Sequence, residues 1–157
     1  MGGKTTGGHD VVYVVTESNT VYAIDATTGA VLAQRNLAAP VPMPLNCNNN
    51  GANVGINGTP VIDSAEKTMY LVTYELDAGT PVHRVHALDI TTLTDVVPSV
   101  VVAASHVLTN GSNVALGSRW QRQRAGLLAA NGNIYVGFAS FCDLQAGNSR
   151  GWILTPP

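Results

Sequence analysis

The sequence from Val12 to Leu37 reads VYVVTESNTVYAIDATTGAVLAQRNL. It contains two runs rich in Val, Tyr and Ile, which are separated by polar residues and followed by a Thr-Thr-Gly turn. β-Branched and aromatic residues between such polar breaks favour short β-strands joined by turns. The run Val11–Val15 has no polar alternation, so we expect an inner strand that is buried on both faces of its sheet.

The same pattern returns twice further along the chain. Tyr13, Tyr70 and Tyr135 stand 57 and 65 residues apart, each inside an apolar run. Asp25 and Asp89 stand 64 residues apart, each ahead of a Thr-rich turn. A recurring unit of this length predicts a repeat architecture in which each unit is one supersecondary element.

Each unit is expected to contain short antiparallel strands that follow one another as a meander. In the second unit we expect four strands, a to d, at about 59–63, 68–75, 82–90 and 97–104. In the third unit, Asn131-Gly132 predicts a tight hairpin. The first unit lacks a clear strand a. Stacking such four-stranded units around an axis buries both faces of each sheet, so the predicted architecture is a β-propeller.

The composition agrees with a single all-β domain. The chain has 157 residues, of which 11% are charged, and its net charge is −2. These values disfavour a helical bundle, a coiled coil and a nucleic acid bound by bulk charge. No apolar run reaches the roughly 18 residues that suggest a membrane span, so no membrane partner is expected. Residues 1–9 are expected to be a flexible leader and residues 10–157 a single partial propeller domain.

The first unit resembles the repeat of pyrroloquinoline-quinone-type β-propellers. The matching residues are Tyr13, Val14, Tyr22, Ala23, Asp25, Thr28 and Gly29, with Gly58–Asp63, Tyr70, Ala87, Leu88 and Asp89 in the second unit. The third unit is similar to a blade of large bacterial secreted propellers in this superfamily. The resemblance implies about three incomplete antiparallel blades, at about 10–40, 56–105 and 123–157. It also implies a parent family that is periplasmic or secreted.

Departures from the family pattern bear on the expected function. The adjacent cysteine pair that covers the quinone in the enzymes of this superfamily is missing, so no quinone or calcium ligand is assigned. The leading expectation is a non-enzymatic repeat scaffold or ligand-binding module, either by itself or as a fragment of a longer protein. The alternatives are an enzyme with a site on the loop face, such as a metal-assisted hydrolase, and a remnant of a quinoprotein oxidoreductase.

Candidate functional residues fall in the loops before strand a and between strands b and c, which emerge on one face of a propeller. The candidates for binding a small ligand are His106, Trp120, Arg122, Arg124 and Asp143. No cofactor is predicted, although thiolate, imidazole and carboxylate groups can hold zinc or another divalent metal. The metal candidates are Cys47, His106, Cys142 and Asp143, and the two cysteines could instead form a disulfide or remain free thiols.

Other polar residues are expected to have structural roles. Asp25 and Asp89 should accept hydrogen bonds from the backbone of the turns that follow them. His83 and His86 stand three positions apart on one strand, so they should point to opposite faces and cannot bind one metal ion together. Residues 64–67 fit an S-x-x-K pattern, but that chemistry needs a helical turn and we expect a hairpin.

Self-association is the last expectation from the sequence, because three blades do not close a ring. The flanks of the first and third units would leave apolar faces and unpaired strand edges exposed. The expected partner is therefore a second copy of the chain, in a homodimer or a higher closed oligomer.

Overall fold

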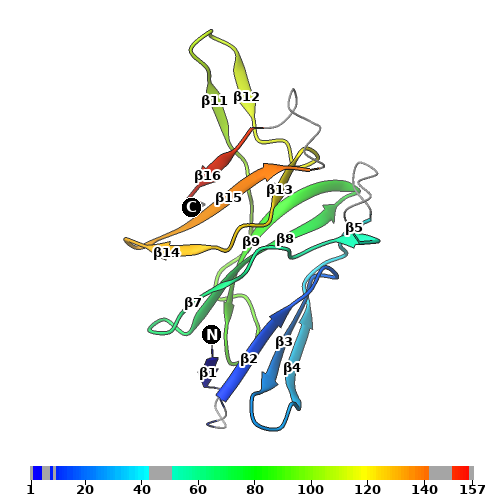
Figure 1. Ribbon diagram of the computed structural model, residues 1–157, viewed down its shortest axis with the longest axis vertical. Helices are drawn as coiled ribbons and strands as arrows, with labels where there is room; N and C mark the ends of the chain where they lie inside the picture. Colours follow the sequence, from blue (N-terminus) through cyan, green and yellow to red (C-terminus); the bar gives the residue numbers. More distant parts are fainter. Residues whose placement is uncertain (1, 5–7, 9, 43–50, 142–149, 156–157) are drawn as a thin grey trace.

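The computed structural model describes residues 2–4, 8, 10–42, 51–141 and 150–155. These residues form strands, turns and loops, and three four-stranded antiparallel sheets make up most of the fold (Figure 1). The expected all-β class is confirmed. Among the described residues no sheet closes on itself, and no helix could cross a membrane.

Sheet one is built from the first unit. In spatial order, its strands are β1 (Gly2–Lys4), β2 (Asp10–Val15), β3 (Thr20–Asp25) and β4 (Val31–Asn36). The sequence predicts a leader without a strand before β2, but the structure pairs β1 with β2 and places Gly2 opposite Val12. The sequence of β1 shows no apolar alternation that would predict a strand. Its pairing with β2 depends on backbone hydrogen bonds, which any residue except proline can donate.

Sheet two is built from the second unit. In spatial order, its strands are β7 (Val61–Asp63), β8 (Thr68–Asp77), β9 (Thr80–Asp89) and β10 (Val100–Val101). This is the predicted four-stranded meander. The β7–β8 connection spans residues 64–67, so the S-x-x-K pattern lies in a hairpin as expected.

Sheet three is built from the third unit and has an interrupted edge. Its strands are β13 (Gln121–Gln123), β14 (Leu128–Ala130), β15 (Asn133–Ser140) and β16 (Trp152–Leu154). β13 and β14 both pair with β15, and β16 pairs with β15 along its other edge. Asn131 and Gly132 have φ angles of 52° and 73°, which confirms the predicted two-residue hairpin between β14 and β15.

Two smaller sheets lie between the main ones in the sequence. β5 (Val41–Pro42) pairs with β6 (Asn53–Val54), and β11 (Ser105–Val107) pairs with β12 (Asn113–Ala115). The β11–β12 hairpin projects away from the three main sheets (Figure 1). The sequence predicts a loop here, because the hairpin buries almost no apolar surface and so carries no strong strand pattern.

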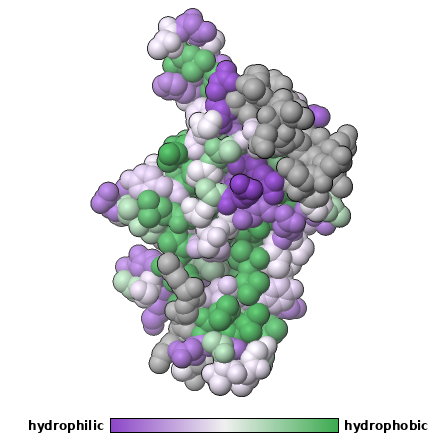
Figure 2. All heavy atoms as spheres, in the orientation of Figure 1, coloured by the Kyte–Doolittle hydropathy of each residue, from purple (hydrophilic) through white to green (hydrophobic). Residues whose placement is uncertain are grey.

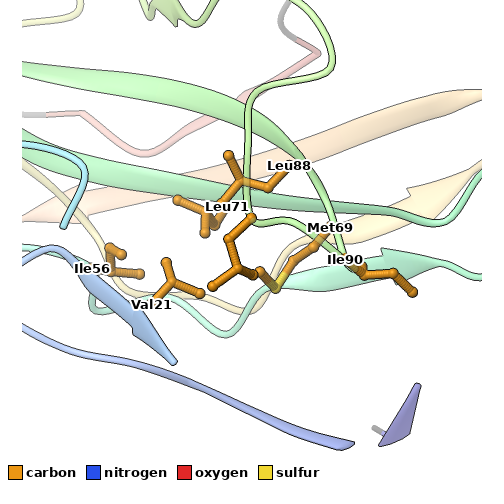
Figure 3. Close-up of a cluster of buried hydrophobic side chains, with 7 residues drawn as sticks. Val21, Ile56, Met69, Leu71, Leu88 and Ile90 are labelled. Carbon is orange, nitrogen blue, oxygen red and sulfur yellow. The ribbon is translucent and has the colours of Figure 1, made fainter. Parts of the chain in front are cut away.

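Sheet two lies between the other two sheets, and each of its faces packs on one of them. Met69, Leu71 and Leu88 pack toward Val21 of sheet one, and Figure 3 shows this cluster. Side chains from the opposite face, such as Val72 and Val85, pack toward Val136 and Phe138 of sheet three. The expectation of strands buried on both faces is therefore confirmed for β8, whose residues 68–75 are buried except for the half-buried Tyr70.

The same expectation is wrong for β2. Val11 is fully buried, but Val12 and Val14 are 46% and 39% exposed on the outer face of sheet one. Figure 2 shows apolar side chains gathered on the surface over the strands of this sheet. An uninterrupted apolar run predicts two covered faces, but here no described part of the chain covers the second one.

Equivalent turns end the third strand of the first two sheets. Oδ1 of Asp25 accepts hydrogen bonds from the backbone of Thr27 and Thr28, both at 2.8 Å. Oδ1 of Asp89 accepts them from Thr91 and Thr92, at 2.7 and 2.9 Å. The predicted structural role of both aspartates is confirmed.

The second of these turns departs from the first at one position. Gly29 has a φ of 75°, and Leu93 takes the equivalent left-handed conformation with a φ of 59°. A residue other than glycine loses roughly 1–2 kcal/mol in this conformation. Leu93 is 1% exposed within the core between sheets one and two, and burial of its side chain contributes roughly 1.5–3 kcal/mol, which offsets that loss.

Candidate functional site

A chain of hydrogen bonds joins two loops and the first strand of sheet three at one end of the stacked sheets. Nε of Arg122 donates to Oδ1 of Asn57 at 2.9 Å, and Nδ2 of Asn57 donates to Oε1 of Glu17 at 2.7 Å. Glu17 lies in the β2–β3 turn, Asn57 precedes β7, and Arg122 lies in β13, the first strand of sheet three. Loops between strands b and c and loops before strand a therefore meet at one end, and we call the set of these three residues the loop-end triad.

Buried glutamines hold the arginine of the triad in position. Gln121 and Gln123 are buried, and because side chains alternate along a strand, Arg122 points to the opposite face of β13. Oε1 of Gln121 accepts a hydrogen bond from the Gly117 backbone at 2.6 Å, and Nε2 of Gln123 donates to the Ala125 carbonyl at 2.7 Å. Both bonds connect β13 to the segments that flank it, and its backbone pairs with β15.

The outer face of sheet three carries a groove of about 680 Å³ beside the triad. Arg122 and Arg124 line it together with Gly137, Trp152 and Ile153. The absence of a side chain at Gly137 deepens the surface at this point. Residues 119–141 and 150–155 contain four arginines, Arg119, Arg122, Arg124 and Arg150.

The other ligand candidates lie elsewhere. His106 is exposed on β11 and lines a second groove, of about 450 Å³, with Arg150 and Leu154. The ring of Trp120 lies against Arg119, whose guanidinium carbon is 5.3 Å from the ring centroid. The structure thus brings Arg122 and Arg124 into one groove and places His106 in another.

Part of the predicted site falls outside the described residues. Cys47, Cys142 and Asp143 lie in segments 43–50 and 142–149, so the predicted disulfide and the predicted metal site remain predictions. Among the residues that the structure describes, no three His, Cys, Asp or Glu side chains are grouped so that they could hold a metal ion.

A second polar cluster, which the sequence does not predict, lies between sheets one and two. Glu75 accepts hydrogen bonds from Arg84 Nε at 2.7 Å and from the Thr73 hydroxyl at 2.6 Å. Nδ1 of His86 lies 2.9 Å from Oδ1 of Asp95, and Arg35 of sheet one forms an ion pair with the same carboxylate. We call these residues the charged cluster.

The carboxylates of the charged cluster are held in their ionised form. Burial by itself would raise the pKa of Glu75, but contacts with His86, Thr73 and Arg84 lower it to about 2. Burial would likewise raise the pKa of Asp95, whereas His86 and Arg35 lower it. Carboxylates that are already paired with guanidinium groups are poor general bases, so the geometry supports a structural role for this cluster.

The two histidines of β9 point to opposite faces, as predicted. His86 lies in the charged cluster, whereas His83 stacks on Tyr74 at 4.5 Å between ring centroids and meets Phe138 of sheet three at 5.1 Å. Nε2 of His83 donates to the Gln121 carbonyl at 2.9 Å, and burial lowers the pKa of His83 to about 4. His83 is therefore a neutral core residue that joins sheet two to sheet three.

One sequence signal could have found half of the charged cluster. Thr73, Glu75 and Asp77 alternate along β8, and Arg84 and His86 alternate along the neighbouring β9. Polar residues at a spacing of two on paired strands indicate a polar strip on one sheet face. The partner Arg35 is 49 positions from Arg84 in sequence, and no local pattern connects them.

Comparison of the chain with models of protein families, with curated proteins and with solved structures finds no match. The geometry and the repeat itself therefore carry the functional argument.

Proposed function

We propose that the chain is a non-enzymatic binding scaffold of the β-propeller type, in which sheets one to three are successive blades and the loop end binds a small anionic ligand. The observation that supports it is the repetition of one contact between neighbouring sheets. Tyr13 of β2 packs toward sheet two, and its hydroxyl donates to the Ile90 carbonyl at 2.7 Å. Tyr70, at the equivalent position of β8, packs toward sheet three.

The residues on either side of the tyrosine pack in the opposite direction, toward the preceding sheet. Met69 and Leu71 flank Tyr70 and pack back toward sheet one. Ile134 and Val136 flank Tyr135 and pack back toward sheet two. Sheets two and three thus turn the same residue positions toward the preceding sheet, and sheets one and two turn the tyrosine toward the following sheet. Consecutive blades of a propeller have this relation.

The loop end supports ligand binding by its position and charge. The loop-end triad joins the β2–β3 turn of sheet one, the segment before β7 of sheet two and β13 of sheet three, so a bound molecule would touch several blades at once. Arg122 and Arg124 present guanidinium groups at one edge of the groove, and guanidinium groups favour carboxylate and phosphate partners.

A titration with inorganic phosphate and citrate, followed by NMR chemical shifts, tests the proposal. We expect shifts to concentrate on β13 and on the loop-end triad. Replacing Arg124 by Gln should weaken binding about tenfold, because a hydrogen bond to a charged group contributes about 1.5–3 kcal/mol. Lys67→Gln removes the same charge from the β7–β8 hairpin at the opposite end of sheet two and serves as the control.

Two results would contradict the anionic ligand. One is the absence of saturable shifts for either probe. The other is an equal loss of binding in the Arg124 and Lys67 variants, because it would show that only overall charge matters.

A further inference from the structure

The two outer faces of the stack are apolar and are built from positions that are buried in the other units. On sheet one, Val12 and Val14 are 46% and 39% exposed. They stand 57 positions before Met69 and Leu71, which are 0% exposed against sheet one. The outer face of sheet one therefore has the character of a face that receives a preceding blade.

The outer face of sheet three has the complementary character. Tyr135 stands 65 positions after Tyr70, which packs on the following sheet, but among the described residues no sheet follows sheet three. Tyr135 shares this face with Leu128, its direct partner across β14 and β15, and with Ile153 of β16. Leu128 and Ile153 are 58% and 79% exposed.

From these two faces we infer that a second copy of the chain docks head to tail, with the outer face of its sheet one on the outer face of sheet three, and that the pair closes on itself. The groove lined by Arg122, Arg124 and Ile153 lies on this face, so in the pair it is bounded by both copies. The inference rests on the proposed stack of blades. It continues the two contacts that already exist inside the chain, from sheet one to sheet two and from sheet two to sheet three. A contact between two copies of the same face would have no counterpart within the molecule.

The available area is sufficient for a stable pair. The strands of sheet one have three to six residues and those of sheet three have three to eight. With a rise of about 3.3 Å per residue and about 4.8 Å between strands, each outer face covers roughly 300 Å². A closed pair covers four such faces, or roughly 1,200 Å² in total, which is at the lower end of the range for specific interfaces. A head-to-tail contact that failed to close would instead produce open filaments.

Light scattering coupled to size exclusion tests the docking with two variants that each block one face. Val14→Glu places a charge on the outer face of sheet one, and Ile153→Glu places one on the outer face of sheet three. Both side chains point away from the core, so the fold should remain intact. Val107→Glu, at a 61% exposed position on the projecting β11–β12 hairpin, is the matched control.

The wild type and the Val107 variant are expected at about twice the chain mass of 16.3 kDa. Each face variant alone should have the mass of one chain. In an equal mixture of the two face variants, the intact sheet three of one variant can still bind the intact sheet one of the other, so pairs should reappear as the protein concentration is raised. These pairs keep one of the two contacts and should be weaker than the wild-type pair. This recovery is specific to head-to-tail docking.

Three outcomes would overturn the inference. A Val14 variant that keeps the mass of two chains would show that sheet one is not used, and open-ended assembly would show that the pair does not close. A wild type with the mass of one chain that still binds phosphate through Arg124 would overturn the docking and leave the proposed function standing.

Discussion

Replacing Glu75 by Gln tests the charged cluster between sheets one and two. The pKa of Glu75 falls from 4.5 to about 2 on folding, and its side chain is 8% exposed. Because the folded pKa lies below the unfolded one, the carboxylate stabilises the fold above pH 4.5, and this stabilisation is lost as the pH falls toward 2. At about 1.4 kcal/mol per pH unit, the shift corresponds to about 3 kcal/mol at neutral pH.

The variant isolates the charge, because Gln keeps the shape of Glu and can still accept a hydrogen bond from Thr73. Urea unfolding at pH 7, 5 and 3 gives the free energy of unfolding of both proteins. We expect the variant to lose about 3 kcal/mol at pH 7 and about 1 kcal/mol at pH 3, where most of the stabilisation from Glu75 is already gone. Glu66→Gln, on the exposed β7–β8 hairpin, is the control and should change little at any pH.

A loss of stability in Glu75→Gln that is the same at all three pH values would contradict stabilisation by the ionised carboxylate. A constant loss would mean that the variant disturbs packing and that the ionised carboxylate contributes nothing of its own. A loss of equal size in the Glu66 variant would point to a general effect of net charge.

Two further predictions concern the contacts that hold sheet three in place. Gly58→Ala should destabilise the fold by about 1–3 kcal/mol, because a Cβ there would lie 2.7 Å from the Ala125 carbonyl oxygen. Gly126→Ala is the control and should be nearly neutral, because the atom nearest to its Cβ would lie 3.6 Å away. Equal thermal unfolding midpoints for the two variants would contradict this packing. Burial lowers the pKa of His83 to about 4, below the unfolded value of 6.5, so the stability that depends on its neutral form should fall by about 3 kcal/mol between pH 6.5 and pH 4. His83→Gln should remove most of that dependence in urea unfolding measured across this range, and an unchanged pH profile would show that another group titrates.

Local signals in the sequence were sufficient for most of the strand order. Asn131-Gly132 favours a two-residue hairpin because both residues tolerate a positive φ, and both have one. Asp25 and Asp89 predict their turns because a short carboxylate reaches the backbone two and three residues ahead. Such signals depend on neighbours within a few positions, so one sequence suffices to read them.

The candidate site could be predicted only in part. The expectation that loops from different units meet at one end agrees with the hydrogen bonds of the loop-end triad. Arg122 and Arg124 stand two positions apart on one strand edge, and the structure places both in one groove. His106 was expected with them because it lies in the same connection, but β11 and β12 carry it away on a separate hairpin.

Tertiary structure alone decided which apolar faces are covered. The runs 11–15 and 69–72 are both uninterrupted by polar breaks in the sequence, yet Val12 is 46% exposed and Met69 is 0% exposed. The difference arises because sheet one lies on one face of sheet two, whereas no described residue lies on the outer face of sheet one. The charged cluster depends on the same stacking, because Arg35 of sheet one meets Asp95 only when sheets one and two pack together. The pattern of apolar residues indicates which strands a sequence forms, but the packing of sheets that are distant in sequence decides what covers each face.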